Sequence, residues 1–116
     1  MVSIPYTLIG QMVDVFSKRG FEQLTFRFED AVPRPGQALE VVDGVWWIRM
    51  PMHGRLNHIN VWLLRDGDGW TIVDTGIFDE GVKTHWRSIF ANYLAGLRIT
   101  RVIATHLHTD HTGLAG

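Results

Sequence analysis

Three of the six histidines in this 116-residue chain fall between His106 and His111, and Asp110 lies among them. In an extended segment, side chains two residues apart point the same way, so His106 and His108 can approach one ion. After the chain turns, the side chains of Asp110 and His111 can approach a second metal position nearby. Imidazole and carboxylate ligands suit zinc, iron or manganese, and an imidazole-rich set favours zinc. The spacing therefore predicts a metal site.

Such a site points to hydrolysis, because a bound metal ion activates water and polarises a carbonyl or phosphoryl oxygen. Asp110 is the candidate catalytic residue, since a carboxylate beside two histidines can also accept a proton from that water. A lone His-x-His would be a weak signal, but the full His-x-His-x-Asp-His at the end of an apolar strand is a strong one. The chain has no cysteine, so histidines and carboxylates must hold any metal.

Two elements lead directly into this segment. Residues 99–104 are typical of a buried strand, with Val102 and Ile103 at its centre, and His106 follows almost at once. Residues 79–95 predict an amphipathic helix, with Gly96 placed just after its end. The apolar stripe expected to face the core consists of Val82, Trp86, Ile89, Phe90, Tyr93 and Leu97.

Upstream of the helix, alternating apolar segments are separated by turn residues with a stereochemical reason to turn. Residues 59–64 are apolar at nearly every position, which favours a strand buried on both faces. Two hairpins are expected: residues 39–42 and 45–50 about Asp43-Gly44, and residues 59–65 and 70–74 about Asp66-Gly67-Asp68-Gly69.

The N-terminal part has a different character. Residues 7–19 predict a short amphipathic helix and residues 24–28 a weak strand. Pro33-Arg34-Pro35-Gly36 indicates a loop, because each proline removes a backbone donor and disfavours helix before it. We expect residues 1–38 to be an N-terminal addition and linker, and residues 39–116 to be the functional unit.

Two motifs give the sequence a family resemblance. Thr-His-Leu-His-Thr-Asp-His-Thr-Gly-Leu-Ala-Gly, residues 105–116, resembles the signature loop of the metallo-β-lactamase superfamily. Residues 60–64 and 70–76 resemble the strand pair and Asp-Thr-Gly element that precede that signature. The resemblance implies an α/β (α+β) fold: the N-terminal half of an αββα sandwich, with a mixed sheet and flanking helices. Residues 1–38 match nothing in the family.

The resemblance also implies roles for individual residues. His106 and His108 would ligate a first metal ion, and Asp110 and His111 a second, giving one or two zinc ions in an intact domain. Asp74 would lie beneath the loop and orient it, as carboxylates near metal ligands do. His111 disfavours the zinc β-lactamases that carry arginine there. Glyoxalase II-like thioesterases, lactonases, tRNA-processing nucleases and the remaining β-lactamases stay open.

The family's other ligands come from its second half, which these residues do not include. The resemblance therefore implies a hydrolase of esters, thioesters, lactones or related bonds as the intact protein, with this fragment inactive by itself. One face of the sheet should lack a cover, so we expect an oligomer with Trp62 or Leu64 between subunits, or a missing C-terminal half. The alternative is a non-catalytic interaction module, or a self-associating fragment, with structural metal or none.

The remaining sequence features indicate which partners and which cellular location to expect. His53 and His58 lie in a polar loop that resembles a loop at the mouth of the family's site, so they are candidates to touch a small-molecule substrate. Alternatively the loop is solvated and His58 bonds to backbone. A net charge of −1 does not indicate a surface that binds nucleic acid or anionic lipid. No secretory signal or run of about 20 apolar residues is visible. We expect a cytoplasmic protein.

Overall fold

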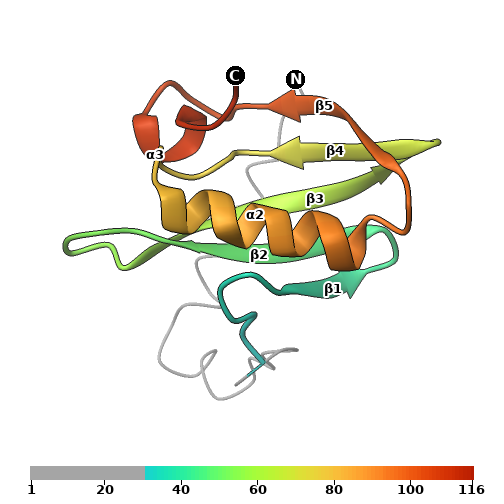
Figure 1. Cartoon of the computed structure of the whole chain (residues 1–116), viewed down its shortest axis with the longest axis horizontal. Coiled ribbons are helices and arrows are strands. Elements are labelled where there is room, and N and C mark those ends of the chain that lie inside the picture. Colours follow the sequence, from blue (N-terminus) through green and yellow to red (C-terminus); the bar gives the residue numbers. More distant parts are fainter. Residues whose placement is uncertain (1–30) are drawn as a thin grey trace, which may run out of the picture. The chain divides into compact units, whose positions relative to one another are not determined.

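The computed structural model describes residues 31–116, which contain one compact unit, Val32–Gly116. The helix predicted over residues 7–19 and the strand over 24–28 lie outside the described residues. The elements follow in the order β1 (Ala38–Val42), β2 (Val45–Pro51), β3 (His58–Asp66), β4 (Gly69–Val73), α2 (Glu80–Tyr93), β5 (Arg98–Ile103) and α3 (Thr109–Thr112) (Figure 1).

The strands form one five-stranded mixed sheet in chain order, β1-β2-β3-β4-β5. The first four strands pair antiparallel, which confirms both predicted hairpins, while β5 pairs parallel to β4. A parallel pair needs a crossover connection, and α2 supplies it by lying across one face of the sheet (Figure 1). The α/β fold expected from the sequence is therefore present as a partial domain.

The helix α2 begins where the sequence predicts. Asp79 caps it, because its Oδ1 accepts hydrogen bonds from the backbone N–H groups of Gly81 at 2.7 Å and Val82 at 3.2 Å. The end differs from the prediction. The helix stops at Tyr93, and Ala95 takes the first left-handed position, with a φ of 52°, ahead of Gly96.

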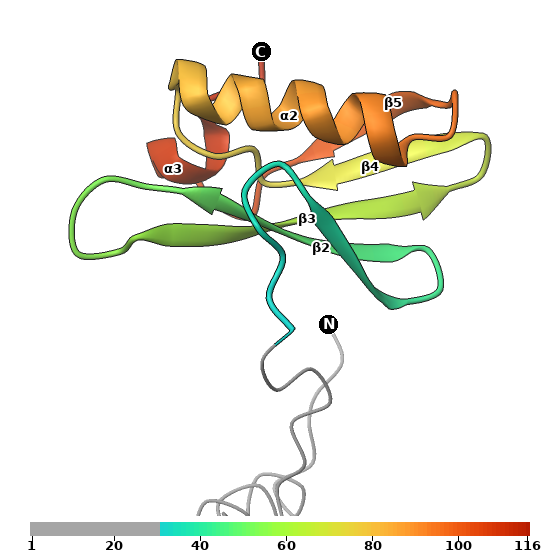
Figure 2. The same cartoon turned by 60° about the horizontal axis from the view of Figure 1, so that its bottom comes forward.

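The core lies between α2 and the sheet face that it covers (Figure 2). Two tryptophans tie the layers together through their indole N–H groups: Trp70 donates to the Leu94 carbonyl at 3.0 Å, and Trp86 to the Thr75 carbonyl at 2.7 Å. The helical stripe is buried at Val82, Trp86 and Ile89. From the sheet, the buried apolar side chains are Ile48, Met50, Ile59, Val61, Leu63, Trp70 and Ile72.

The opposite face of β3 is less buried than predicted. Ile59, Val61 and Leu63 are buried under α2, whereas Trp62 and Leu64 are half-buried. Within residues 31–116, the expectation that residues 59–64 are buried on both faces is therefore not met, whereas the expectation that one face of the sheet lacks a cover agrees with the structure. The physical reason is that α2 covers only one face of the sheet.

The strand β5 departs from prediction in the same way. Its central residues Val102 and Ile103 are 41% and 43% exposed, although the sequence predicts a buried strand. Phe90, expected in the buried stripe of α2, is 40% exposed. β5 is an edge strand, with β4 as its single neighbour in the sheet. Neither helix among residues 31–116 is long and apolar enough to cross a membrane.

Candidate metal centre

The predicted metal loop begins where the two parallel strands end. Val73 of β4 is the register partner of Ile103 of β5, so both chains leave the sheet at the same edge. The Asp74 N–H continues the pairing by donating to the Ile103 carbonyl at 2.8 Å. This edge, at the carboxyl ends of parallel strands, is where ligands commonly bind in α/β sheets.

Asp74 holds the start of the loop from below. Its side chain is 5% exposed, and Oδ1 accepts a hydrogen bond from the Thr105 N–H at 2.8 Å. The other oxygen, Oδ2, accepts from the Thr105 hydroxyl at 2.8 Å and lies 2.7 Å from Nδ1 of His111. Burial alone raises the pKa of Asp74, but the hydrogen bonds from Thr105 and His111 outweigh it and leave the pKa below its usual value. The group is therefore a carboxylate near neutral pH.

These bonds also assign the tautomers of two histidines. A carboxylate only accepts hydrogen bonds, so the Thr105 hydroxyl donates its proton to Asp74. That hydroxyl can then only accept from His106, whose Nδ1 lies 3.0 Å away. By the same reasoning His111 donates to Asp74 through Nδ1. In the neutral form of each imidazole, this leaves Nε2 as the free lone pair that a metal ion requires.

The imidazoles of His106 and His111 lie near the carboxylate of Asp110. One ligand atom each from His106, Asp110 and His111 lies within 4.8 Å of the others. Ligand atoms around a single zinc ion lie about 2.0–2.2 Å from it, hence at most about 4.4 Å from each other. Small side-chain movements would bring the three groups to that spacing. The donor set of two imidazoles and one carboxylate therefore fits a transition metal ion.

His108 lies beside this group and not within it. Its ring centroid is 4.7 Å from that of His106, and its backbone carbonyl accepts the His111 N–H at 2.9 Å at the start of α3. The resemblance pairs His106 with His108 and Asp110 with His111. In the structure His106 lies near His108 and also groups with Asp110 and His111, with its ring centroid 4.0 Å from that of His111.

Residues that had no role in the sequence-based prediction also hold α3 in place. The buried Thr75 accepts the Leu114 N–H at 3.1 Å, while its hydroxyl and backbone N–H both donate to the His111 carbonyl, at 3.0 and 2.9 Å. Gly113 allows a close approach, since a Cβ there would lie 2.5 Å from the Phe78 nitrogen. The motifs at residues 70–76 and 105–116 contain Thr75, Thr105 and Gly113, but only the structure shows which groups these residues contact.

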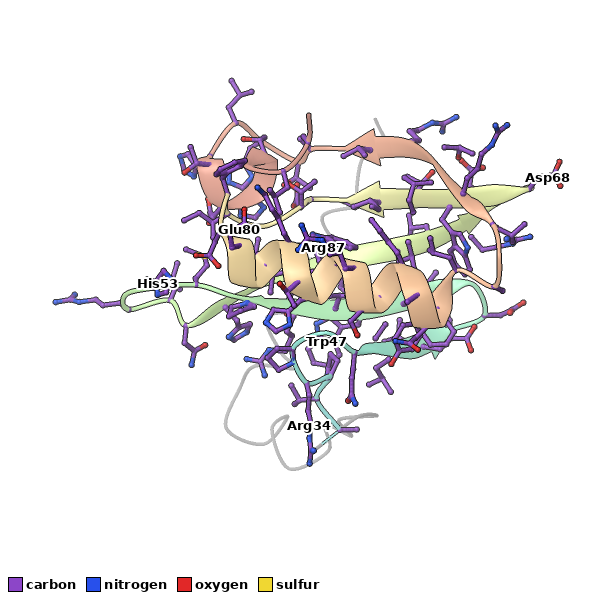
Figure 3. The ribbon with its side chains drawn as sticks, in the orientation of Figure 1. Arg34, Trp47, His53, Asp68, Glu80 and Arg87 are labelled. Atoms are coloured by element: carbon purple, nitrogen blue, oxygen red, sulfur yellow. The ribbon has the colours of Figure 1, made fainter. Side chains whose placement is uncertain are left out.

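Of the two candidate substrate-side histidines, His53 lies in the β2–β3 loop and His58 is the first residue of β3. The side chain of His53 is 88% exposed, and its Nε2 lies 3.9 Å from the Asp79 carboxylate. Figure 3 shows His53 at the same end of the sheet as Glu80, with Asp68 at the opposite end. His58 contacts the side chains of Arg49 and Asn57. Neither histidine belongs to the metal-binding group.

A mixed sheet with a helical crossover and a His/Asp cluster at the carboxyl ends of its parallel strands defines an α/β domain with a candidate metal site. A sequence model of the metallo-beta-lactamase superfamily matches residues 54–116, more than half of the chain. The chain belongs to the metallo-beta-lactamase superfamily.

Solved structures agree with this assignment. A beta-lactamase domain protein from Burkholderia ambifaria is 52% identical, with a TM-score of 0.76 over 81% of this chain and 29% of that one. A metallo-beta-lactamase family protein from Thermus thermophilus is 25% identical, with a TM-score of 0.59 over 66% of this chain and 26% of that one.

Curated relatives are more distant. The chain is 29% identical over 80 residues to the acyl-coenzyme A thioesterase MBLAC2 of Homo sapiens, covering 61% of this chain and 28% of the relative. The protein of the same name from Gallus gallus is 31% identical over 75 residues, covering 60% and 26%. The chain thus spans between about a quarter and a third of the length of each of these relatives.

Proposed function

We propose that this chain provides the first part of the active site of a metal-dependent hydrolase, with zinc as the metal. The observation that carries the proposal is the grouping of His106, Asp110 and His111, with both imidazoles held so that Nε2 is free. Iron or manganese would suit the same donors less well, because an imidazole-rich site favours zinc.

Among the bonds such a site can cleave, a thioester is the substrate class we favour. The mammalian and avian relatives carry the name acyl-coenzyme A thioesterase, and esters and lactones share the same reacting carbonyl. When bound, zinc would supply Lewis acidity toward that carbonyl and lower the pKa of water.

The residues of this chain would divide the remaining work. Asp110 would hold the metal and accept the proton that water gives up. His106 and His111 would bind through Nε2, while Asp74 keeps their orientation, directly for His111 and through the Thr105 hydroxyl for His106. Catalytic zinc sites have three protein ligands and a water for each ion. His106, Asp110 and His111 could supply these three ligands for one ion, whereas the resemblance implies a second ion and further ligands from outside residues 1–116. We propose that residues 1–116 alone bind zinc more weakly than the intact site and do not turn over substrate.

Calorimetric titration of the 116-residue chain with zinc tests the proposal. We expect saturable binding that His106→Ala or His111→Ala weakens at least about tenfold. His85→Ala, on α2 away from the loop, is the matched control and should bind as the unaltered chain does. Equal zinc affinity in all four proteins would contradict the proposed site. Hydrolysis of a generic thioester by the chain alone would overturn the proposed division of the site.

A further inference from the structure

A cavity lies at the base of the β2–β3 hairpin. It has a volume of about 280 Å³ and is lined by Pro33, Pro35, Arg49, Pro51, Asn57 and His58. His58 opens β3 four residues before Trp62, whose register partner Val73 ends β4. The cavity therefore lies at the end of the sheet from which the metal loop emerges.

The guanidinium of Arg49 lacks an acidic partner in this cavity. No carboxylate within residues 31–116 lies within ion-pair distance of it, and its buried Nε has no hydrogen-bond acceptor. Its Nη2 lies 2.6 Å from the ring nitrogens of His58, which is a neutral partner. A buried donor without an acceptor destabilises the folded chain, and the cost is larger when the group is charged.

The surrounding groups favour an anion as the missing acceptor. Burial and the positive charge of Arg49 lower the pKa of His58, so its ring is uncharged near neutral pH and does not neutralise Arg49. The Asn57 side-chain oxygen contacts Nδ1 of His58, which leaves the amide N–H₂ of Asn57 as a donor. The proline residues contribute no N–H groups. Among residues 31–116, the one charged side chain that lines the cavity is therefore Arg49, and it has no acidic partner within that part of the chain.

We propose that this cavity binds a phosphate or carboxylate group through Arg49, with Asn57 and His58 as neighbouring polar contacts. The volume is slightly below the range of about 300–1,000 Å³ that pockets for drug-sized ligands occupy, so it suits one anionic group of a larger molecule or a free anion. A guanidinium offers paired donors in a fork that matches both kinds of oxyanion. The proposal does not depend on the hydrolase function, because the cavity contains none of the metal-binding residues.

Titration of the metal-free 116-residue chain with inorganic phosphate, followed by amide NMR shifts, tests the site. We expect saturable shifts at Arg49 and His58. Removing one charge-assisted contact costs about 1.5–3 kcal/mol, so Arg49→Gln should weaken binding by about ten- to a hundredfold. Arg55→Gln, an exposed arginine in the same hairpin, is the matched control and should leave phosphate affinity unchanged.

A second titration with coenzyme A distinguishes the sources of the anion. Binding at least about tenfold tighter than phosphate, and lost in Arg49→Gln, would assign the site to the phosphates of a substrate. Equal affinities would assign it to a free anion, and both results uphold the cavity as an anion site. No saturable binding of either probe, or equal affinity in the unaltered chain and Arg49→Gln, would overturn it. If Arg49→Gln does not fold by circular dichroism, Arg49→Lys and His58→Gln carry the same comparison.

Discussion

The carboxylate of Asp74 lies 2.7 Å from Nδ1 of His111, and this contact joins the end of β4 to the short helix α3. The same carboxylate reaches His106 through the Thr105 hydroxyl. One buried acid at the end of one strand therefore orients two candidate ligands from another segment of the chain.

Zinc affinity should depend on this acid, although Asp74 does not itself belong to the metal-binding group. Loss of such an orienting partner typically costs about 10- to 100-fold in metal affinity, and we expect that loss for Asp74→Ala. Calorimetric titration with zinc measures it. Asp68→Ala, at the exposed tip of the opposite end of the sheet, is the control. An unchanged zinc affinity in a folded Asp74→Ala protein would contradict the orienting role.

The packing of α3 should depend on the absence of a side chain at Gly113. A Cβ there would lie 2.5 Å from the Phe78 nitrogen and 2.8 Å from the Gly76 carbonyl oxygen, so backbone must shift. We expect Gly113→Ala to lower the free energy of unfolding by about 1–3 kcal/mol, as overpacking does. Urea unfolding measures the change. Gly116→Ala, where a Cβ would meet nothing within 4 Å, should have almost no effect, and equal stabilities of the two variants would refute the steric explanation.

The stability of the chain should contain a contribution from His58 that depends on pH. Burial and Arg49 lower its pKa below 6.5 in the folded state. The unfolded state therefore takes up the proton first, and stability falls as the pH drops from about 6.5 to the folded pKa. We expect His58→Gln to lose this part of the decline. Urea unfolding between pH 7.5 and 5 measures the difference between the two proteins.

The direct check is the NMR titration of the His58 ring. A midpoint at or above 6.5 would reverse the sign of the expected pH dependence. His53→Gln removes a histidine whose side chain is 88% exposed and serves as the matched control for the unfolding experiment.

Self-association of the 116-residue chain remains a prediction. Trp47, Trp62, Val73 and Ile103 are register partners in a row across four strands, and Ile103 is 43% exposed. Two copies of such an apolar row can cover each other about a two-fold axis. We expect a dimer by sedimentation equilibrium at micromolar concentration and a monomer for Trp62→Glu. Phe78→Glu, which removes an exposed aromatic outside the row, should leave the dimer intact. If the unaltered chain is a monomer at this concentration, the prediction of self-association is wrong.

Apolar periodicity was sufficient to predict the four antiparallel strands, α2 and β5, because each pattern is local to its own element. Burial was predicted less well, since the exposure of Val102 or Trp62 depends on which layers are present and not on the strand itself. The spacing of His106, Asp110 and His111 was sufficient to identify them as candidate metal ligands, and their binding of a metal stays a prediction. The roles of Thr105 and Thr75 could not be identified in this way, because their hydrogen bonds join residues 31 to 39 positions apart.

The parallel pairing of β4 and β5 has a consequence for the order in which the molecule assembles. Strands β1 to β4 pair with their chain neighbours through short connections, and such hairpins form in about 1–10 μs. The contact of Thr100 with Trp70 closes a loop of 30 residues, and non-local pairing of this kind is slow to form. During synthesis from the N-terminus, Asp74 is made before Thr105 and His111, the residues that donate hydrogen bonds to its side chain. Its carboxylate therefore stays in contact with water until residues 105–111 have left the ribosome. A peptide of residues 105–116 would contain every histidine of the loop and lack the carboxylate that orients them.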